Sequence, residues 1–297
     1  MSKENETKQK RNKAVPDFLR LVVLLVAFSV LLYPTISNYL YQKNQSRVIS
    51  VYDEAAEKLS KQDNEEMIDQ AREYNKEMLS NVELLDPFAP GAKEISERYE
   101  SVLNVNGAGM MGYIRIPKID VELPIYHGTK EAVLQVGVGH FEGTSFPVGG
   151  ESTHAVLTGH RGLPSKLLFT DLDKLGEGDV FYIKILEETF AYEVDQILTV
   201  LPEETQALSI VSGKDYVTLV TCTPYAVNTH RLLVRGHRVP YEQAVQITED
   251  VVVEAKLPFQ VQMLLFAMVV LVISGIGLAI WSRKQKKVRK ERREKDV

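Results

Sequence analysis

The chain has a single cysteine, Cys222, among its 297 residues. An intramolecular disulfide is therefore excluded. No group of cysteines and histidines has the spacing of a metal site, so we expect no metal and no other cofactor. A lone thiol in an exported domain is exposed to oxidation without a structural benefit, which favours a chemical role for it there. The alternative is that Cys222 is a small buried hydrophobic residue in a strand, as most lone cysteines are.

Charged residues are missing from residues 257–281 near the C-terminus. As a helix this stretch would be about 37 Å long at 1.5 Å per residue, which is enough to cross the hydrocarbon core of a bilayer. A second apolar stretch, residues 18–40, contains Pro34 and resembles a signal peptide in length. No small-x-small cleavage site follows it, so we expect an uncleaved anchor. The sequence therefore predicts two transmembrane helices.

Both tails outside these apolar stretches, residues 1–17 and 282–297, are rich in Lys and Arg. By the positive-inside rule both termini are cytoplasmic and residues 41–256 face outward. The basic C-terminal tail could be a nucleic-acid patch, but its place beside a membrane helix favours contact with anionic lipids. We therefore expect a membrane and no nucleic acid among the partners. The net charge of -5 conceals cationic ends and an acidic middle, and the lack of disulfides fits a bacterial cell envelope.

The first part of the exterior region, residues 41–104, has a helical pattern. Residues 50–80 place apolar side chains at helical spacing and leave a charged face, which predicts an amphipathic helix or a helix pair. Such a helix would serve as a stalk or, alternatively, as a partner-binding surface. Residues 84–91 hold two prolines and a glycine and are expected to form a loop. Asp86 in this loop precedes a large aromatic residue and would suit a cationic partner such as Arg231.

The second part, residues 105–245, has short alternating runs that predict strands at regular spacing. We expect a hairpin of long strands at 179–201 and one short helix at 165–175. Many short strands with turn signals indicate an all-β barrel or sandwich. About 140 residues is ample for one core.

Cys222 ends the predicted strand 216–222, and Arg231 begins the next run after a Pro-Tyr-Ala-Val-Asn-Thr turn. The two residues can therefore face one another across a short loop. A guanidinium group nearby favours the nucleophilic thiolate and offers fork-shaped donors to an oxyanion. This arrangement is a plausible half of an active site.

A catalytic cysteine usually needs a general acid/base, which is commonly a histidine. The chain has six histidines. His160 ends a predicted strand, residues 154–160, and precedes a proline-containing loop. At such a place a rigid scaffold presents functional side chains. Sequence spacing does not decide among the six, and a structural or surface role is the commoner one for a lone histidine.

These residues occur in linked motifs that resemble the sortases, cysteine transpeptidases of Gram-positive bacteria. The motifs are Thr-Leu-Val-Thr-Cys at 218–222, Arg231 nine residues on, and Thr-Gly-His at 158–160. The stretches 157–162, 169–172, 222–225 and 228–232 resemble the class C, pilus-building subgroup, and the resemblance covers about residues 40–245. Asp86-Pro87-Phe88 is similar to the lid of that subgroup, in which an Asp and an aromatic residue cover the active site. Many members have Trp where this chain has Phe88, and a C-terminal membrane helix is also typical of class C.

The resemblance implies a sortase-type eight-stranded β-barrel with short helices, an N-terminal helical and lid segment, and a membrane-anchored transpeptidase. It would cleave a Leu-Pro-x-Thr-Gly-like sorting signal between Thr and Gly and join pilin subunits through isopeptide bonds to a lysine. The implied roles are nucleophile for Cys222, general acid/base for His160, oxyanion and substrate stabiliser for Arg231, and lid for Asp86, Pro87 and Phe88. Alternatives are a sortase that anchors surface proteins to the cell wall, a hydrolytic cysteine protease, and a non-catalytic membrane-tethered adhesin or sensor.

Overall fold

A computed structural model describes residues 2–78, 86–89, 96–105, 107–163 and 165–250, with a few positions between 262 and 274, and side chains are described from residue 22 to residue 248 within these ranges. The chain forms two compact units, Met1–Ser37 with Glu254–Val297, and Asn38–Val253. The second unit holds every residue of the candidate site. Of the loop expected at 84–91, only Asp86–Ala89 belongs to the described residues.

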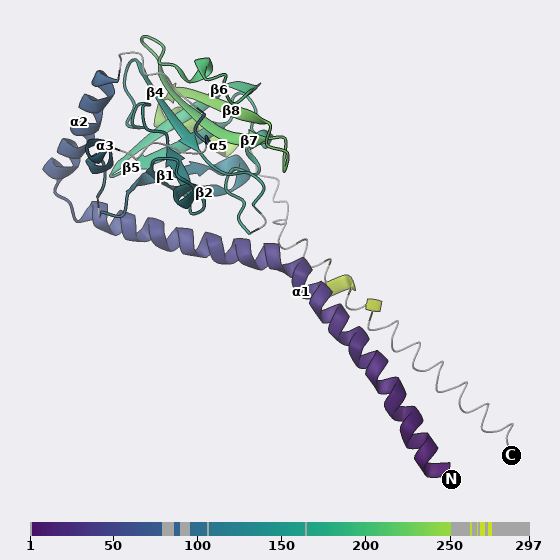
Figure 1. Cartoon of the computed structure of the whole chain (residues 1–297). Helices are drawn as coiled ribbons and strands as arrows, with labels where there is room; N and C mark the ends of the chain where they lie inside the picture. The colour runs from purple at the N-terminus through teal and green to yellow at the C-terminus, as the bar shows by residue number, and fades with distance from the viewer. Residues whose placement is uncertain are drawn as a thin grey trace. The chain divides into compact units, whose positions relative to one another are not determined.

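The second unit is built on a closed barrel of eight strands in the order β1-β2-β3-β4-β7-β8-β6-β5 (Figure 1). This confirms the predicted eight-stranded barrel, including its long hairpin. The strands are β1 Met110–Ile116, β2 Val121–His127, β3 Val138–His140, β4 Thr153–Thr158, β5 Val180–Ile185, β6 Glu188–Val200, β7 Asp215–Thr223 and β8 His230–Val239.

The burial of each strand follows from what covers its two faces. β4 is buried at every position and β7 at all but its two ends. The two strands pair in parallel, and parallel strands that are covered on both faces are expected to be apolar along their whole length. β5 instead alternates towards its end between buried and partly exposed residues, as a strand with one covered face does. The site therefore lies on a pair of deeply buried strands.

The helices lie before, between and after the strands. α1 spans Ser2–Glu57 and α2 spans Lys61–Glu77, so the helix pair predicted over 50–80 is confirmed. The side chain of Ser60 accepts a hydrogen bond from the Asp63 backbone and Asp63 returns one, a capping box that starts α2 after the break. The shorter helices are α3 Glu97–Ser101, α4 Glu131–Leu134, α5 Tyr241–Asp250 and the 3-10 turns η1 Pro117–Ile119, η2 Leu172–Lys174 and η3 Gln206–Leu208.

The helix expected at 165–175 is wrong. This segment forms turns followed by the 3-10 turn η2. Leu168 has a φ of 40°, outside the helical region. The Phe169 backbone N–H donates to the His160 carbonyl at 3.1 Å rather than to a helical neighbour. The segment therefore follows its tertiary contact with the His160 loop rather than its local pattern.

The C-terminal half of α1 packs on the barrel through Tyr52, which is fully buried. Its hydroxyl donates to the Met111 carbonyl at 2.9 Å and accepts from the Leu186 backbone N–H at 2.8 Å. One phenol thus joins α1 to β1 and to the β5–β6 turn. Burial, the largest cause, raises the pKa of Tyr52 well above its usual value, so it stays neutral at physiological pH.

One helical segment of the described residues, Val22–Glu57, is long and apolar enough to cross a membrane. It overlaps the predicted anchor at 18–40. Pro34 lies inside α1 and does not end it. The second predicted membrane helix, residues 257–281, lies outside the described residues apart from a few positions.

Candidate active site

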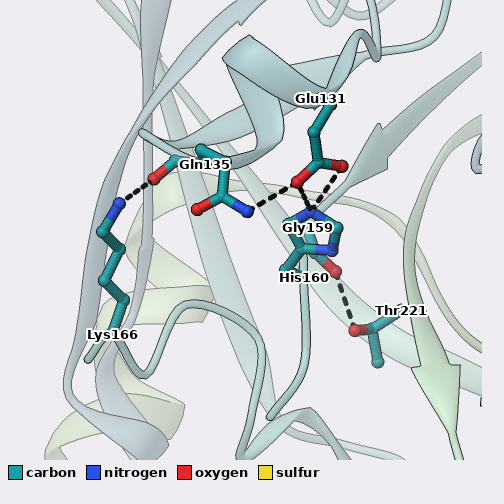
Figure 2. A network of polar contacts seen from close by, with 6 residues as sticks. All are labelled: Glu131, Gln135, Gly159, His160, Lys166 and Thr221. Atoms are coloured by element: carbon teal, nitrogen blue, oxygen red, sulfur yellow. Dashed lines mark hydrogen bonds and ion pairs between the residues drawn. The ribbon is translucent and has the colours of Figure 1, made fainter. Parts of the chain in front are cut away.

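Strands β4 and β7 bring His160 and Cys222 to the same edge of the barrel. The Gly159 backbone N–H donates to the Val220 carbonyl at 3.0 Å, and the Thr221 hydroxyl donates to the Gly159 carbonyl at 2.7 Å (Figure 2). These two bonds fix the residues immediately before His160 and Cys222. The register of β4 and β7 therefore determines where His160 and Cys222 lie.

Strand β8 places Arg231 directly opposite Cys222 in the antiparallel ladder with β7. Side chains of such a cross-strand pair lie next to each other on one face of the sheet. The β7–β8 loop turns with Ala226 and Asn228 at positive φ. Nη1 of Arg231 donates at 3.2 Å to the carbonyls of Asn228 and His230. The guanidinium is thereby held beside the thiol by its own loop.

The segment Asp86–Phe88 covers this edge. The Asp86 carboxylate accepts two hydrogen bonds from Arg231, from Nε at 2.8 Å and from Nη2 at 2.5 Å. The Phe88 ring centre lies 5.0 Å from the Arg231 guanidinium carbon and 5.8 Å from the His160 ring centre. Pro87, between Asp86 and Phe88 in the sequence, is buried. Phe88 also packs on an apolar cluster of Val156, Leu208, Val220 and Leu233. The structure thus brings the predicted lid residues against Arg231 and His160.

The covered thiol is electrostatically disfavoured as a thiolate. Cys222 is 9% exposed. Burial, as the largest cause, raises the pKa of Cys222, Asp86 raises it further, and Arg231 opposes both. Burial and Asp86 thus both act against the thiolate form, and Arg231 favours it.

His160 differs from three other histidines of the barrel in burial and in its partner. His127, His140 and His154 are buried and hydrogen-bonded, and burial lowers the pKa of His140 to about 3 and that of His154 to about 4. The His160 side chain is 18% exposed, and its Nε2 lies 3.2 Å from each carboxylate oxygen of Glu131. Burial thus sets these three histidines apart from His160, whereas His230 and His237 are partly exposed as His160 is.

Two residues at this edge were missed by sequence reasoning. Glu131, the first residue of α4, lies 29 positions before His160, and nothing in its local sequence marks it. Arg161 donates from Nη1 to the Thr223 hydroxyl at 3.1 Å and forms an ion pair with Asp173. It thereby connects the residue after His160 with the residue after Cys222. The sequence signal that could have identified Arg161 is its position directly after the Thr-Gly-His motif. Among the described residues, no cluster of three or more His, Cys, Asp and Glu side chains could hold a metal ion.

Comparison with known proteins places this geometry in a family. The family model for the sortase domain matches residues 114–239, which include the three predicted catalytic residues. Sortase C of Streptococcus pneumoniae is 48% identical over 66% of this chain and 97% of its own solved chain, with a TM-score of 0.62. The chain belongs to the class C sortases. Sortase C1 of Streptococcus agalactiae is 51% identical, with a TM-score of 0.60, over 65% of this chain and 98% of that one.

Sortases of other groups are more distant from this class C chain. Sortase D of Bacillus subtilis is 31% identical over 43% of this chain and 63% of its own length. Sortase A of Streptococcus agalactiae is 33% identical over 43% of this chain and 52% of its own length. The chain therefore spans less than two thirds of these relatives, and the match is concentrated in the barrel.

Proposed function

We propose that the chain is a membrane-anchored cysteine transpeptidase that joins pilin subunits. The observation that carries this proposal is the edge formed by β4, β7 and β8, with Cys222 opposite Arg231 and His160 on the neighbouring strand end. Solved relatives support the substrate class: the pneumococcal sortase C is described with respect to pilin substrate specificity, and a group B Streptococcus sortase C as pilus-related. The apolar segment within α1 supports anchoring, with the catalytic domain outside and both termini cytoplasmic.

The first half-reaction cleaves a Leu-Pro-x-Thr-Gly-like sorting signal. The Cys222 thiolate attacks the threonine carbonyl and forms a C–S bond, and the carbonyl oxygen becomes an oxyanion. Arg231 donates hydrogen bonds to this oxyanion. When the C–N bond breaks, the protonated His160 transfers its proton to the departing glycine amine. The donor pilin is left as a thioester on Cys222.

The second half-reaction joins the donor to its neighbour. A lysine amine of the acceptor pilin attacks the thioester carbonyl, and Arg231 again stabilises the oxyanion. Neutral His160 accepts the proton from the amine, and the C–S bond breaks to release the Cys222 thiolate. The product is an isopeptide bond, and the enzyme returns to its initial protonation state.

The lid must open for either step to occur. In the closed form, Nε and Nη2 of Arg231 are occupied by Asp86, so these donors are withheld from an oxyanion. Phe88 fills the apolar cluster beside Cys222, which would otherwise offer a surface to the apolar part of a sorting signal. Asp86 thus occupies the position proposed for the oxyanion of the substrate, and Phe88 occupies the position proposed for an apolar side chain of the sorting signal.

The test uses the whole chain in lipid nanodiscs, with Asp86→Ala and Phe88→Ala together to open the lid. It is incubated with a Leu-Pro-x-Thr-Gly peptide and a lysine-bearing pilin domain, and the products are analysed by mass spectrometry. We expect a thioester adduct on Cys222 and then an amide-linked conjugate, and neither product with Cys222→Ala. Hydrolysed peptide without conjugate would support a protease. A conjugate formed with a cell-wall peptide amine and not with the pilin lysine would support anchoring of surface proteins.

A further inference from the structure

The hydrogen-bond partner of the His160 imidazole is a carboxylate that the proposed reaction does not use. Glu131 directs both carboxylate oxygens at Nε2 of His160, at 3.2 Å each (Figure 2). In the same view Thr221, the residue before Cys222, lies on the other side of the imidazole. We infer that Glu131 is a positioning residue that fixes the orientation and the proton of His160. This inference rests on the proposed function, in which His160 is the general acid and base.

The contacts around Glu131 hold it in place. Nε2 of Gln135 donates to Oε1 of Glu131 at 2.5 Å, and Lys166 donates from Nζ to the Gln135 carbonyl. The next carbonyl, that of Val136, accepts from the Tyr41 hydroxyl at 3.1 Å. The short α4 segment is thus tied to the loop after His160 and to α1.

Further bonds between α1 and the same two loops strengthen this support. Gln45 Nε2 also donates to the Val136 carbonyl, at 2.9 Å. The Leu167 backbone N–H donates to Oδ1 of Asn38 at 3.0 Å. α1 therefore contacts both the loop that follows Glu131 and the loop that follows His160, and the separation of the two side chains is set by a common support.

Glu131 is ionised at neutral pH. The hydrogen bond from Gln135 is the largest cause that holds the pKa of Glu131 below its usual value, burial acts in the opposite direction, and His160 lowers it further. An anionic partner at Nε2 favours the tautomer with its proton on Nε2 and leaves Nδ1 as the nitrogen that exchanges a proton with the reacting groups. The same carboxylate stabilises the imidazolium that must protonate the leaving amine.

The expected effect is intermediate because Glu131 is exposed. Its side chain is 67% exposed, so solvent screens the ion pair much more than in a buried Ser-His-Asp triad, where the wrong tautomer costs about 10⁴-fold in rate. We expect a loss of about tenfold in kcat/KM on removal of the carboxylate. The other titratable or charged groups at this edge are Cys222, Arg231, Asp86, Arg161 and Lys166. All five are retained in the first arm of the test, and Asp86 is replaced by Ala in every variant of the second arm, the reference included.

The first arm of the test does not depend on activity. The whole chain is labelled with ¹⁵N-histidine, and the ring nitrogens of His160 are assigned by their loss in His160→Gln. We expect the neutral Nε2–H tautomer in the parent chain, its partial retention in Glu131→Gln because the amide oxygen still accepts a hydrogen bond, and a mixture of tautomers in Glu131→Ala. An unchanged tautomer in Glu131→Ala would overturn the inference even if the chain proved to be a transpeptidase.

The second arm measures the pH profile of kcat/KM for conjugate formation in the lid-opened background. In Glu131→Gln and Glu131→Ala we expect the limb that reports the protonated imidazole to move to lower pH, and Glu131→Asp to recover part of the rate. The matched control is Glu122→Gln, which removes a half-exposed carboxylate paired with Arg115 at 3.3 Å and leaves the profile unchanged. Equal effects of the two substitutions would assign Glu131 a merely structural role. If no conjugate forms in any variant, the proposed function fails while the tautomer arm still decides the inference.

Discussion

Two histidines of this barrel lie against an aromatic ring at nearly the same distance, and the two rings are held differently. Tyr99 stacks on His140 at 5.7 Å and 22°, and its hydroxyl lies 2.8 Å from Nδ1 of that histidine and donates to its carbonyl at 2.9 Å. Phe88 lies 5.8 Å from His160 at 35°, and a phenyl ring offers no hydrogen bond of its own. The first cover is fixed by polar bonds, whereas the second depends on its neighbour Asp86.

The difference separates a structural histidine from a reactive one. His140 is fully buried, its Nε2 lies 2.8 Å from the Ser145 carbonyl, and burial keeps it neutral with a pKa of about 3. His160 keeps part of its ring exposed and has a carboxylate partner. An aromatic neighbour is thus not itself a sign of a structural role, because what matters is whether the neighbour can move away.

The largest expected effect separates the two histidines by activity. His160→Gln removes the proposed general acid and base, and we expect kcat/KM for conjugate formation to fall by about 10²- to 10⁴-fold. His140→Gln should leave kcat/KM of the folded protein within about twofold, since that histidine contacts no reacting group. Steady-state kinetics on both variants in the lid-opened background measures the contrast. Similar losses in both would remove the functional distinction between them.

The second prediction concerns stability, for which we expect the larger effect at His140 and the smaller one at His160. His140→Ala leaves a cavity, removes the imidazole partner of the Ser145 carbonyl and removes one of the partners of the Tyr99 hydroxyl, so we expect a loss of about 3 kcal/mol in the free energy of unfolding. His160→Ala, on a partly exposed ring, should cost less than about 1 kcal/mol. Thermal unfolding of the two variants in the same detergent gives the comparison. A larger drop in Tm for His160→Ala would contradict it.

Much of the barrel could be predicted from the sequence because its signals are local. Alternating β-branched runs and turn residues predicted the strands, and the short turn after Cys222 predicted that Arg231 would face it, as the β7–β8 register shows. The helix expected at 165–175 failed for the opposite reason. Its Phe169 backbone N–H donates to the His160 carbonyl and not to a helical neighbour, a contact that no local pattern reports.

The choice among the histidines could not be made from local signals either. His154 and His160 belong to the same predicted strand, yet one is buried against Ser209 and Thr218 and the other lies beyond the strand end. Burial depends on which strands become neighbours in the closed barrel, so it appears only in the fold. The pairing of Glu131 with His160 is of the same kind, because α4 and the end of β4 meet only through the barrel topology.

The third effect uses acid to sharpen the comparison. Burial lowers the pKa of His140 to about 3 and that of His154 to about 4, whereas both titrate near 6.5 in the unfolded chain. Each therefore contributes stability that is present above pH 6.5 and is lost as pH falls towards its folded pKa, by up to about 1.4 kcal/mol per pH unit for each histidine. Unfolding measured from pH 7 to pH 4.5 should show this slope. His154→Gln should make it shallower, and an identical slope would refute the assignment.

The smallest expected effect tests whether the second cover is removable. Phe88→Ala deletes a ring that lies over Arg231 at 5.0 Å and packs on the apolar cluster that includes Val220 of β7. Such a contact is worth about 0.5–1 kcal/mol at a partly exposed site. We therefore expect the rate of Cys222 alkylation by iodoacetamide to rise about two- to fivefold at pH 7.5. Asp86→Ala in addition should raise it further, because Asp86 contributes to the raised pKa of Cys222.

The control for this experiment is Tyr241→Ala, which removes a half-exposed aromatic side chain from α5, where it packs against Tyr182 of β5. Its alkylation rate should match that of the parent chain. An unchanged rate in the double lid variant would show that Asp86 and Phe88 do not limit access to the thiol. A rise in the double lid variant without a rise in Tyr241→Ala would show that Phe88 leaves His160 once the Asp86–Arg231 pair separates. The hydrogen bonds account for the contrast with Tyr99, which remains bonded to His140.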